Sequence, residues 1–309
     1  MKKYLWGIVY GLLLTTFTVY VLMDTFVITR VYTTVPFDDN DGSSVIIDNA
    51  DDKDDSAQSQ SNISSVVLTE NAYSDGNISI TITEYRENGT TIYVADVQLS
   101  SAEYLQTALA KGAYGKNVTD KTSEIAEDNN AILAINGDYY GAQEKGYVLR
   151  NGVLYRSTAQ SGQEDLVIYA DGSFEIINEK DVSAESLLNA GAQQILSFGP
   201  ALIMDGRISV TEDEEVGKAK SSNPRTALGI IDALHYVFVV SDGRTSESEG
   251  LSLHELAEFM QSLNVEVAYN LDGGGSSTMV FNGEVINKPT TNGKSIKERS
   301  VSDIVYIGY

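Results

Sequence analysis

The longest apolar run of this 309-residue chain lies at its N-terminus. Residues 4–23 carry no charged side chain, and Lys2 and Lys3 stand directly before them. A helix of about 20 residues spans about 30 Å, the thickness of a bilayer's hydrocarbon core. We predict an uncleaved signal anchor over residues 1–35; a cleaved signal peptide is the alternative, although no clear small-x-small site follows. By the positive-inside rule, the lysines keep the N-terminus cytoplasmic and place the rest of the chain outside the cell membrane.

Residues 36–65 have a different composition. They contain eight Asp and a single Lys53, followed by a Ser/Gln-rich run, which predicts an extended, disordered stalk. The stretch 39–42 resembles a calcium-binding loop, but the EF-hand pattern requires an oxygen ligand at position 37, where Phe37 stands. We therefore interpret this segment as a solvated spacer.

From about residue 66, short alternating segments predict a sheet-rich domain over residues 66–309. The run 78–83 alternates apolar and polar residues as a half-buried strand does, and Asn88-Gly89 turns it into 91–97 as a hairpin. Similar turns recur at residues 151, 171, 205 and 282, and helices are predicted over 122–130, 183–189 and 252–263. The expected fold is α+β or mixed α/β, a single catalytic domain with many hairpins that follows a transmembrane helix.

One βαβ unit is expected near the C-terminus. The apolar run 237–240, the helix 252–263 and the run 265–269 follow one another, so the two strands should be parallel. Ligands bind beyond the carboxyl ends of such strands. The turn at 242–244 and the glycine-rich segment 270–276 would then share one edge of the sheet. A flexible glycine turn is the alternative interpretation.

Charge and composition restrict the function. The net charge of −23 repels nucleic acids, so an anionic ligand must be held by local arginines. The chain has no Cys and two His, which excludes disulfides, thiolate chemistry and Cys-based zinc sites and disfavours a His-dependent triad.

Two further motifs carry candidate binding residues. Arg225 and Thr226 are at the start of a strand, where an arginine can form two parallel hydrogen bonds to a carboxylate or phosphate; a surface salt bridge is the alternative. Asn136-Gly137 follows a buried run and is either a site loop or another hairpin turn.

Five of these motifs, in their order along the chain, resemble the phosphodiester glycosidase family. Each is short and weak alone, but five in the right order are specific, and the similarity covers most of residues 70–309. Two departures, an acidic loop at 245–249 and the absence of the animal members' cysteine-rich extensions, leave the leaving group and the partner open. The motifs are Asn136-Gly137, Gly199-Pro200 before Asp205-Gly206-Arg207, Arg225 to Gly229, Asp242 to Arg244, and Asn270 to Ser276, with Arg299 as a further family position.

The resemblance implies an extracytoplasmic hydrolase that cleaves a sugar-1-phosphodiester, N-acetylglucosamine-like, on cell-surface or exopolysaccharide glycans. It implies Asp272 as base or nucleophile, with Asp242 and Asp138 as the other catalytic carboxylates. It requires no cofactor and assigns no metal ligand, although a divalent cation such as calcium stays open. A transferase that remodels phosphate-linked surface polymers and a non-catalytic wall-glycan binding protein are the alternatives. The expected substrate-binding residues are Asn136, Gly137, Arg225, Thr226, Arg244, Asn270, Gly273, Gly274, Gly275, Ser276 and Arg299.

Overall fold

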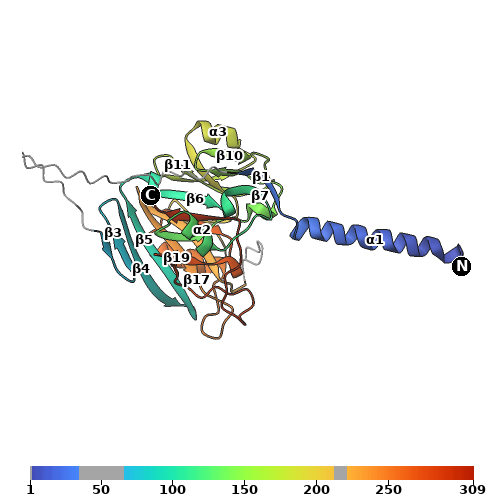
Figure 1. Cartoon of the computed structure of the whole chain (residues 1–309). Coiled ribbons are helices and arrows are strands. Elements are labelled where there is room, and N and C mark those ends of the chain that lie inside the picture. The colour runs from blue at the N-terminus through green and yellow to red at the C-terminus, as the bar shows by residue number, and fades with distance from the viewer. Residues whose placement is uncertain (1, 35–65, 212–220) are drawn as a thin grey trace, which may run out of the picture.

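The computed structural model describes residues 2–34, 66–211 and 221–309. Helix α1 (Lys2–Phe26) projects away from the rest of the chain (Figure 1). Its residues Trp6–Phe26 are long and apolar enough to cross a membrane, and none of them is buried against the protein.

The chain joins the folded body directly after α1. Strand β1 (Arg30–Thr34) pairs antiparallel with β7 (Ala113–Lys116), so the contact with the domain begins before the acidic segment. The predicted stalk itself, 36–65, lies outside the described residues. By its place in the chain, it connects β1 to β2 and does not separate α1 from the domain.

A nine-stranded sheet forms the centre of the domain, in the order β15-β14-β18-β16-β17-β5-β4-β3-β2. Its middle strands are buried on both faces, because α4 (Leu253–Ser262) covers one face and two smaller sheets pack on the other. The strands are β2 (Val67–Leu68), β3 (Ala72–Ser74), β4 (Ile78–Glu87), β5 (Thr90–Leu99), β14 (Ala201–Met204), β15 (Arg207–Ile208), β16 (Arg225–Asp232), β17 (His235–Ser241) and β18 (Val267–Leu271).

Each smaller sheet has five strands and its own short helix. Helix α2 (Thr122–Asp128) packs on the sheet β20-β19-β8-β21-β6, and α3 (Ala184–Asn189) packs on β10-β9-β13-β11-β12. The first sheet contains β6 (Leu105–Leu109), β8 (Leu133–Asn136), β19 (Met279–Phe281), β20 (Glu284–Val285) and β21 (Asp303–Ile307). The second contains β9 (Val148–Arg150), β10 (Val153–Arg156), β11 (Glu164–Tyr169), β12 (Phe174–Asn178) and β13 (Ala192–Leu196).

The predicted local elements are present. All five predicted hairpins occur, as β4–β5, β9–β10, β11–β12, β14–β15 and β19–β20. Helix α4 begins with the predicted capping box between Ser252 and Glu255. Strands β17 and β18 are parallel to each other as predicted, because both pair antiparallel with β16. They are not direct neighbours, however: β16 lies between them, so the unit is a split βαβ.

Candidate active site

The split βαβ unit explains how three distant segments meet at one edge of the large sheet. Asp272 follows the carboxyl end of β18, and Arg244 follows that of β17. Because β16 is antiparallel to both, its amino end lies at the same edge: Arg225 is opposite Ser241, and Thr226 is opposite Leu271. The register of the sheet thus brings one carboxylate and two guanidinium groups together.

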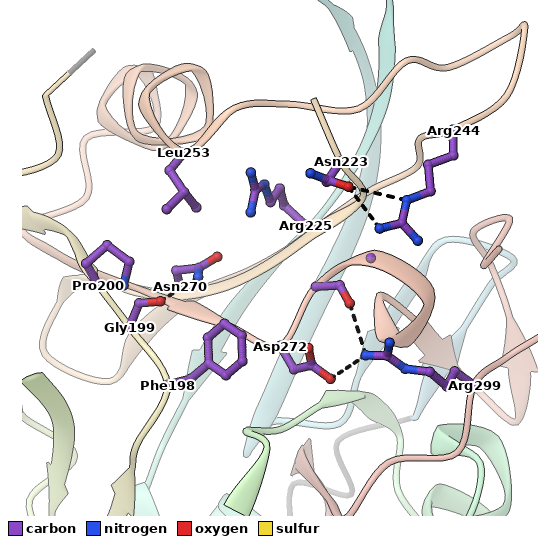
Figure 2. Close-up of a pocket in the computed structure, with 12 residues that line it drawn as sticks. Phe198, Gly199, Pro200, Asn223, Arg225, Arg244, Leu253, Asn270, Asp272 and Arg299 are labelled. Atoms are coloured by element: carbon purple, nitrogen blue, oxygen red, sulfur yellow. Dashed lines mark hydrogen bonds and ion pairs between the residues drawn. The ribbon is translucent and has the colours of Figure 1, made fainter. Parts of the chain in front are cut away.

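Asp272 is held by two side chains from the same region. Its Oδ2 accepts a hydrogen bond from Ser276 Oγ at 2.6 Å. The same oxygen accepts one from Arg299 Nη2 at 2.7 Å (Figure 2). Burial raises the pKa of Asp272 above its usual value, while the charge of Arg299 and the Ser276 hydroxyl oppose that rise. The pair is nonetheless reachable from outside, since 13% of the Asp272 side chain and 41% of the Arg299 side chain are exposed.

A cavity of ≈ 290 Å³ opens beside this ion pair, and we call it the arginine cavity. Figure 2 shows Arg225 and Arg244 on one side of it and the Asp272–Arg299 pair on the other. The Arg244 guanidinium donates to two neutral groups, Asn223 Oδ1 at 2.9 Å and Thr291 O at 2.6 Å. The lining residues are Phe198, Gly199, Pro200, Asn223, Arg225, Arg244, Leu253, Asn270, Asp272, Gly273, Gly274 and Arg299.

Arg225 is affected by burial and by its neighbour in the cavity. Burial, together with the positive charge of Arg244, lowers the pKa of Arg225 to about 10. Arg225 still carries its charge at neutral pH. Two cations that face one cavity are stabilised by an anion placed between them, so the arrangement suits a phosphate group.

The glycines that follow Asp272 are required by close packing. A Cβ atom on Gly274, whose φ is +63°, would lie 2.9 Å from Arg244 Nη2, and one on Gly275 would lie 2.4 Å from Thr291 Oγ1. The Gly274 N–H donates to Pro224 O at 2.8 Å and is therefore not directed at a ligand. Gly273 and Gly274 line the arginine cavity, whereas Gly275 is buried behind it.

Asn136 and its neighbours support the Asp272 loop from behind. Asn136 is fully buried, and its Nδ2 donates to Asp272 O at 2.6 Å while its Oδ1 accepts from Thr226 Oγ1 at 2.8 Å. The carbonyl of Gly137 accepts from Asp272 N at 3.3 Å. The structure thus places Asn136, Gly137 and Thr226 against the backbone of the loop and not in the arginine cavity.

Asn270 lines the cavity from inside β18, which runs two residues further than the sequence predicts. Its Nδ2 donates to Gly199 O at 2.7 Å. Its Oδ1 is buried and has no hydrogen-bond partner among the described residues, so this atom can accept a hydrogen bond from a ligand.

Asp138 belongs to a separate, buried ion cluster. Its Oδ2 lies 2.7 Å from Arg150 Nη2, and Arg150 Nε donates to Asp303 Oδ2 at 2.8 Å. Asp138 is 1% exposed and also accepts from the backbone of Tyr140 and Ser197. Sequence reasoning missed Arg150 and Asp303; the one available signal is a charged residue within the buried run of β21.

Asp242 holds a loop and does not line the arginine cavity. Its Oδ1 accepts from Lys288 N at 2.8 Å and from Asn287 Nδ2 at 3.2 Å, and burial raises its pKa. Of the three carboxylates that the sequence selected, only Asp272 therefore lines this cavity. Sequence reasoning did not select Phe198, Asn223 and Leu253 as binding residues, although Asn223 precedes the Arg225 motif.

Within residues 2–34, 66–211 and 221–309, no three Asp, Glu, His or Cys side chains come close enough together to hold a metal ion. The calcium ion that the sequence left open therefore stays a prediction without such a ligand group among these residues.

The fold and the site define a sheet-rich enzyme domain with an arginine-lined cavity beside a carboxylate. The model of the phosphodiester glycosidase family matches residues 129–308, so the chain belongs to this family. The cattle N-acetylglucosamine-1-phosphodiester alpha-N-acetylglucosaminidase is 38% identical over 184 residues, which are 54% of this chain and 34% of the cattle protein. The uncharacterized prophage-derived protein YomE of Bacillus subtilis is 26% identical over 201 residues, 63% of this chain and 31% of that protein.

The chain thus spans about a third of the length of these two curated relatives. Among solved structures, the catalytic domain of the zebrafish N-acetylglucosamine-1-phosphodiester alpha-N-acetylglucosaminidase, auto-inhibited by its pro-peptide, matches with a TM-score of 0.60. The match covers 75% of this chain and 83% of the zebrafish chain at 21% identity, which shows a shared fold.

Proposed function

We propose that this protein is an extracytoplasmic glycosidase that hydrolyses a sugar-1-phosphodiester, N-acetylglucosamine-like, on cell-surface or exopolysaccharide glycans. One observation carries the proposal: the Asp272 carboxylate lies at the wall of a cavity that Arg225 and Arg244 also line. The names of the cattle, mouse and human relatives support the substrate class.

The proposed reaction breaks the bond between the sugar C1 and the bridging oxygen. The bonding electron pair stays on that oxygen, which leaves as part of a phosphate monoester, and water supplies the new hydroxyl on C1. A phosphate monoester is a good leaving group, so this reaction has less need of the general acid that glycosidases usually employ. Arg225 and Arg244 hold the phosphate and stabilise its developing charge.

Asp272 acts at C1, either as the base that takes the proton from water or as the nucleophile. Arg299 and Ser276 keep its carboxylate oriented. The two roles predict opposite stereochemistry: a base inverts the anomeric centre, and a nucleophile retains it through a covalent intermediate. The anomer of the first free sugar, followed by NMR, distinguishes them.

The proposed location follows from α1. With Lys2 and Lys3 on the cytoplasmic side, a membrane-spanning α1 places the phosphodiester glycosidase domain outside the cell. We propose 66–309 as its main extent, with β1 as an added strand because β1 pairs with β7.

The test uses the full chain in detergent micelles or lipid nanodiscs with an α-N-acetylglucosamine-1-phosphodiester. We expect free sugar as the product, and in H₂¹⁸O we expect the label on the sugar and not on the phosphate. Asp272→Asn should lower kcat/KM by about 10⁴-fold, the upper range for a positioned acid–base group. The matched control is Asp205→Asn, an exposed aspartate in a turn.

Three results would contradict the assignment. Absence of sugar release by the wild type would favour a glycan-binding protein. Sugar transferred to a glycan acceptor in preference to water would favour a transferase. Unchanged release by Asp272→Asn would remove Asp272 from the chemistry.

A further inference from the structure

A second cavity, of ≈ 270 Å³, borders the same ion pair, because Asp272 and Arg299 line both cavities. We call it the α1-side cavity. Its other walls come from four segments that are far apart in the chain. They are Thr25 and Phe26 at the end of α1, Asn117 and Thr119 after β7, Asp138, Tyr139, Gly141 and Ala142 after β8, and Ser300 to Ser302 before β21.

The α1-side cavity differs chemically from the arginine cavity. Among the described residues, Arg299 is the one cation in its lining, and most of the other polar groups are neutral hydroxyls and amides. Tyr139 lies on the same loop as Asp138, and this residue is 46% exposed. An exposed aromatic ring with hydroxyl and amide neighbours suits a neutral polyhydroxylated group such as a sugar ring, whose apolar face can lie on the aromatic surface.

The end of α1 is fastened beside this cavity. Asn117 Nδ2 donates to Thr25 O at 3.2 Å and to Ile28 O at 3.1 Å, and Thr29 Oγ1 donates to Asn117 O at 3.3 Å. Strand β1 then pairs with β7, and the Tyr32 ring lies 5.8 Å from that of Tyr114.

These contacts fix the depth of the cavity relative to a membrane-spanning α1. Figure 1 shows α1 directed away from the domain, beyond β1 and β7. Four residue steps separate Phe26 from Arg30, a reach of about 14 Å at most. If α1 spans the bilayer, the α1-side cavity therefore lies at the membrane surface.

We propose that the α1-side cavity binds the sugar of the substrate while the arginine cavity binds its phosphate, and that the enzyme acts on sugars attached close to the membrane surface. The scissile bond then lies beside Asp272, which both cavities share. This inference rests on the proposed function and on α1 as a membrane span, and it narrows the substrate to membrane-proximal glycans.

The first experiment measures the dependence on distance from the membrane, with the full chain in nanodiscs. Three probes carry the same N-acetylglucosamine-1-phosphodiester, and each releases the same soluble phosphate monoester. One probe is soluble; the other two are attached through a non-anomeric hydroxyl to a dialkyl lipid, either directly or through a long polyethylene glycol spacer. We expect kcat/KM for the directly attached probe to exceed that for the spacer probe at least tenfold.

The matched variant carries a 20-residue Gly/Ser insertion between Met23 and Asp24, which leaves the uncharged run 4–23 as the span and keeps Thr25 and Phe26 in the cavity wall. Such an insertion adds a flexible link with an end-to-end distance of about 25 Å, which separates the cavity from the membrane surface. We expect its kcat/KM for the soluble probe to stay within twofold of the wild type, while the preference for the directly attached probe disappears. A preference that survives the insertion, or no preference in the wild type, would overturn the inference and leave the proposed function intact. If the wild type cleaves none of the three probes, both this inference and the proposed function are contradicted.

The second experiment tests the sugar contact. Tyr139→Ala should raise KM for the soluble probe at least tenfold with little change in kcat, and inhibition by inorganic phosphate should be unchanged because phosphate occupies the arginine cavity. Tyr309→Ala is the control, since Tyr309 is exposed and lies at the end of the domain opposite α1 (Figure 1). An unchanged KM in Tyr139→Ala, or an equal loss of phosphate inhibition, would overturn the sugar assignment.

Discussion

Two carboxylate–arginine pairs lie close together in this protein, and they differ in exposure. The Asp272–Arg299 pair and the Asp138–Arg150 pair both have an N–O distance of 2.7 Å. The backbone of Gly137 links the two pairs. Gly137 directly precedes Asp138 in the chain, and its carbonyl oxygen accepts a hydrogen bond from Asp272 N. However, the Arg299 side chain is 41% exposed and the Arg150 side chain is 2% exposed. The Asp272–Arg299 pair can therefore contact a substrate, whereas the Asp138–Arg150 pair is almost inaccessible and holds strands together.

The buried side of this comparison extends beyond one pair. Ser197 N donates to Asp138 Oδ2 at 2.9 Å, and Ser197 Oγ donates to Glu179 Oε1 at 3.2 Å, which connects Asp138 to a further carboxylate pair, Asp165 and Glu179. We call the set Asp138, Arg150, Asp165, Glu179 and Asp303 the sealed cluster. It contains four carboxyl groups and one cation. Burial, together with the neighbouring carboxylates, raises the pKa of Asp165 to about 9 and that of Asp303 to about 7, so the cluster retains protons near neutral pH.

Arg150→Met should cause the largest loss of stability. It leaves the carboxylates of Asp138 and Asp303 buried without their cation, and breaking a buried pair in this way costs about 3–5 kcal/mol. Urea unfolding of the full chain in detergent measures the loss, with the surface variant Arg207→Met as the control. Below the unfolding transition, the activity per folded molecule should match the wild type. A variant of normal stability that lacks activity would instead place the sealed cluster in the chemistry.

Asp165→Asn should change how stability depends on pH. The folded-state pKa of about 9 lies above the ordinary 3.8, so between these values the folded state holds a proton that the unfolded state has lost. Unfolding then becomes easier as pH rises: the contribution is fully present below about pH 4 and is lost by about pH 9. Relative to Asp165→Asn, the wild type should lose about 1.4 kcal/mol per pH unit, or about 3 kcal/mol between pH 5 and pH 7.

Urea unfolding of both proteins at pH 5, 6 and 7 measures this difference. The exposed Asp181 provides the control, and Asp181→Asn should follow the wild-type pH dependence. Parallel curves for Asp165→Asn and the wild type would mean that Asp165 is ionised when folded, contrary to the burial argument.

The same comparison explains which features of the fold and the site could be predicted from the sequence. The capping box of α4, the hairpin turns and the presence of strand β18 depend on neighbouring residues, and the sequence predicts them, although β18 ends two residues later than predicted. The role of Asp138 does not depend on neighbours: it follows from Arg150 on β9 and Asp303 on β21, whose five positions are all buried and show no alternation. An acidic residue after a strand looks the same in sequence whether a distant arginine seals it or not. The pairing of β1 with β7, about 80 residues apart, is hidden for the same reason.

Arg244→Ala sharpens the exposed side of the comparison. Its guanidinium contacts Asn223 and Thr291, which are neutral groups, so its removal leaves no buried charge unpaired and should change stability little. Loss of a charged hydrogen bond to phosphate costs about 1.5–3 kcal/mol, so kcat/KM should fall about 10- to 150-fold. Inhibition by inorganic phosphate should weaken in parallel, and Arg207→Ala should change neither quantity. Unchanged inhibition by phosphate would mean that phosphate does not bind in the arginine cavity.

Ser276→Ala should have the smallest effect and reports on the charge of Asp272. The hydroxyl donates to Asp272 Oδ2 at 2.6 Å and accepts from Arg299 Nε at 2.9 Å. A hydrogen bond to a charged group contributes about 1.5 kcal/mol at the lower end of its range, so kcat/KM should fall about tenfold at neutral pH. Burial already raises the pKa of Asp272, and loss of this hydrogen bond removes one of the groups that lower it. If Asp272 acts as a carboxylate, the rate falls below its pKa, and the acidic limb of the pH–rate profile must move to higher pH in Ser276→Ala. A limb that moves to lower pH, or stays in place, would mean that the titrating group is not Asp272, and the exposed pair would then be as structural as the sealed one.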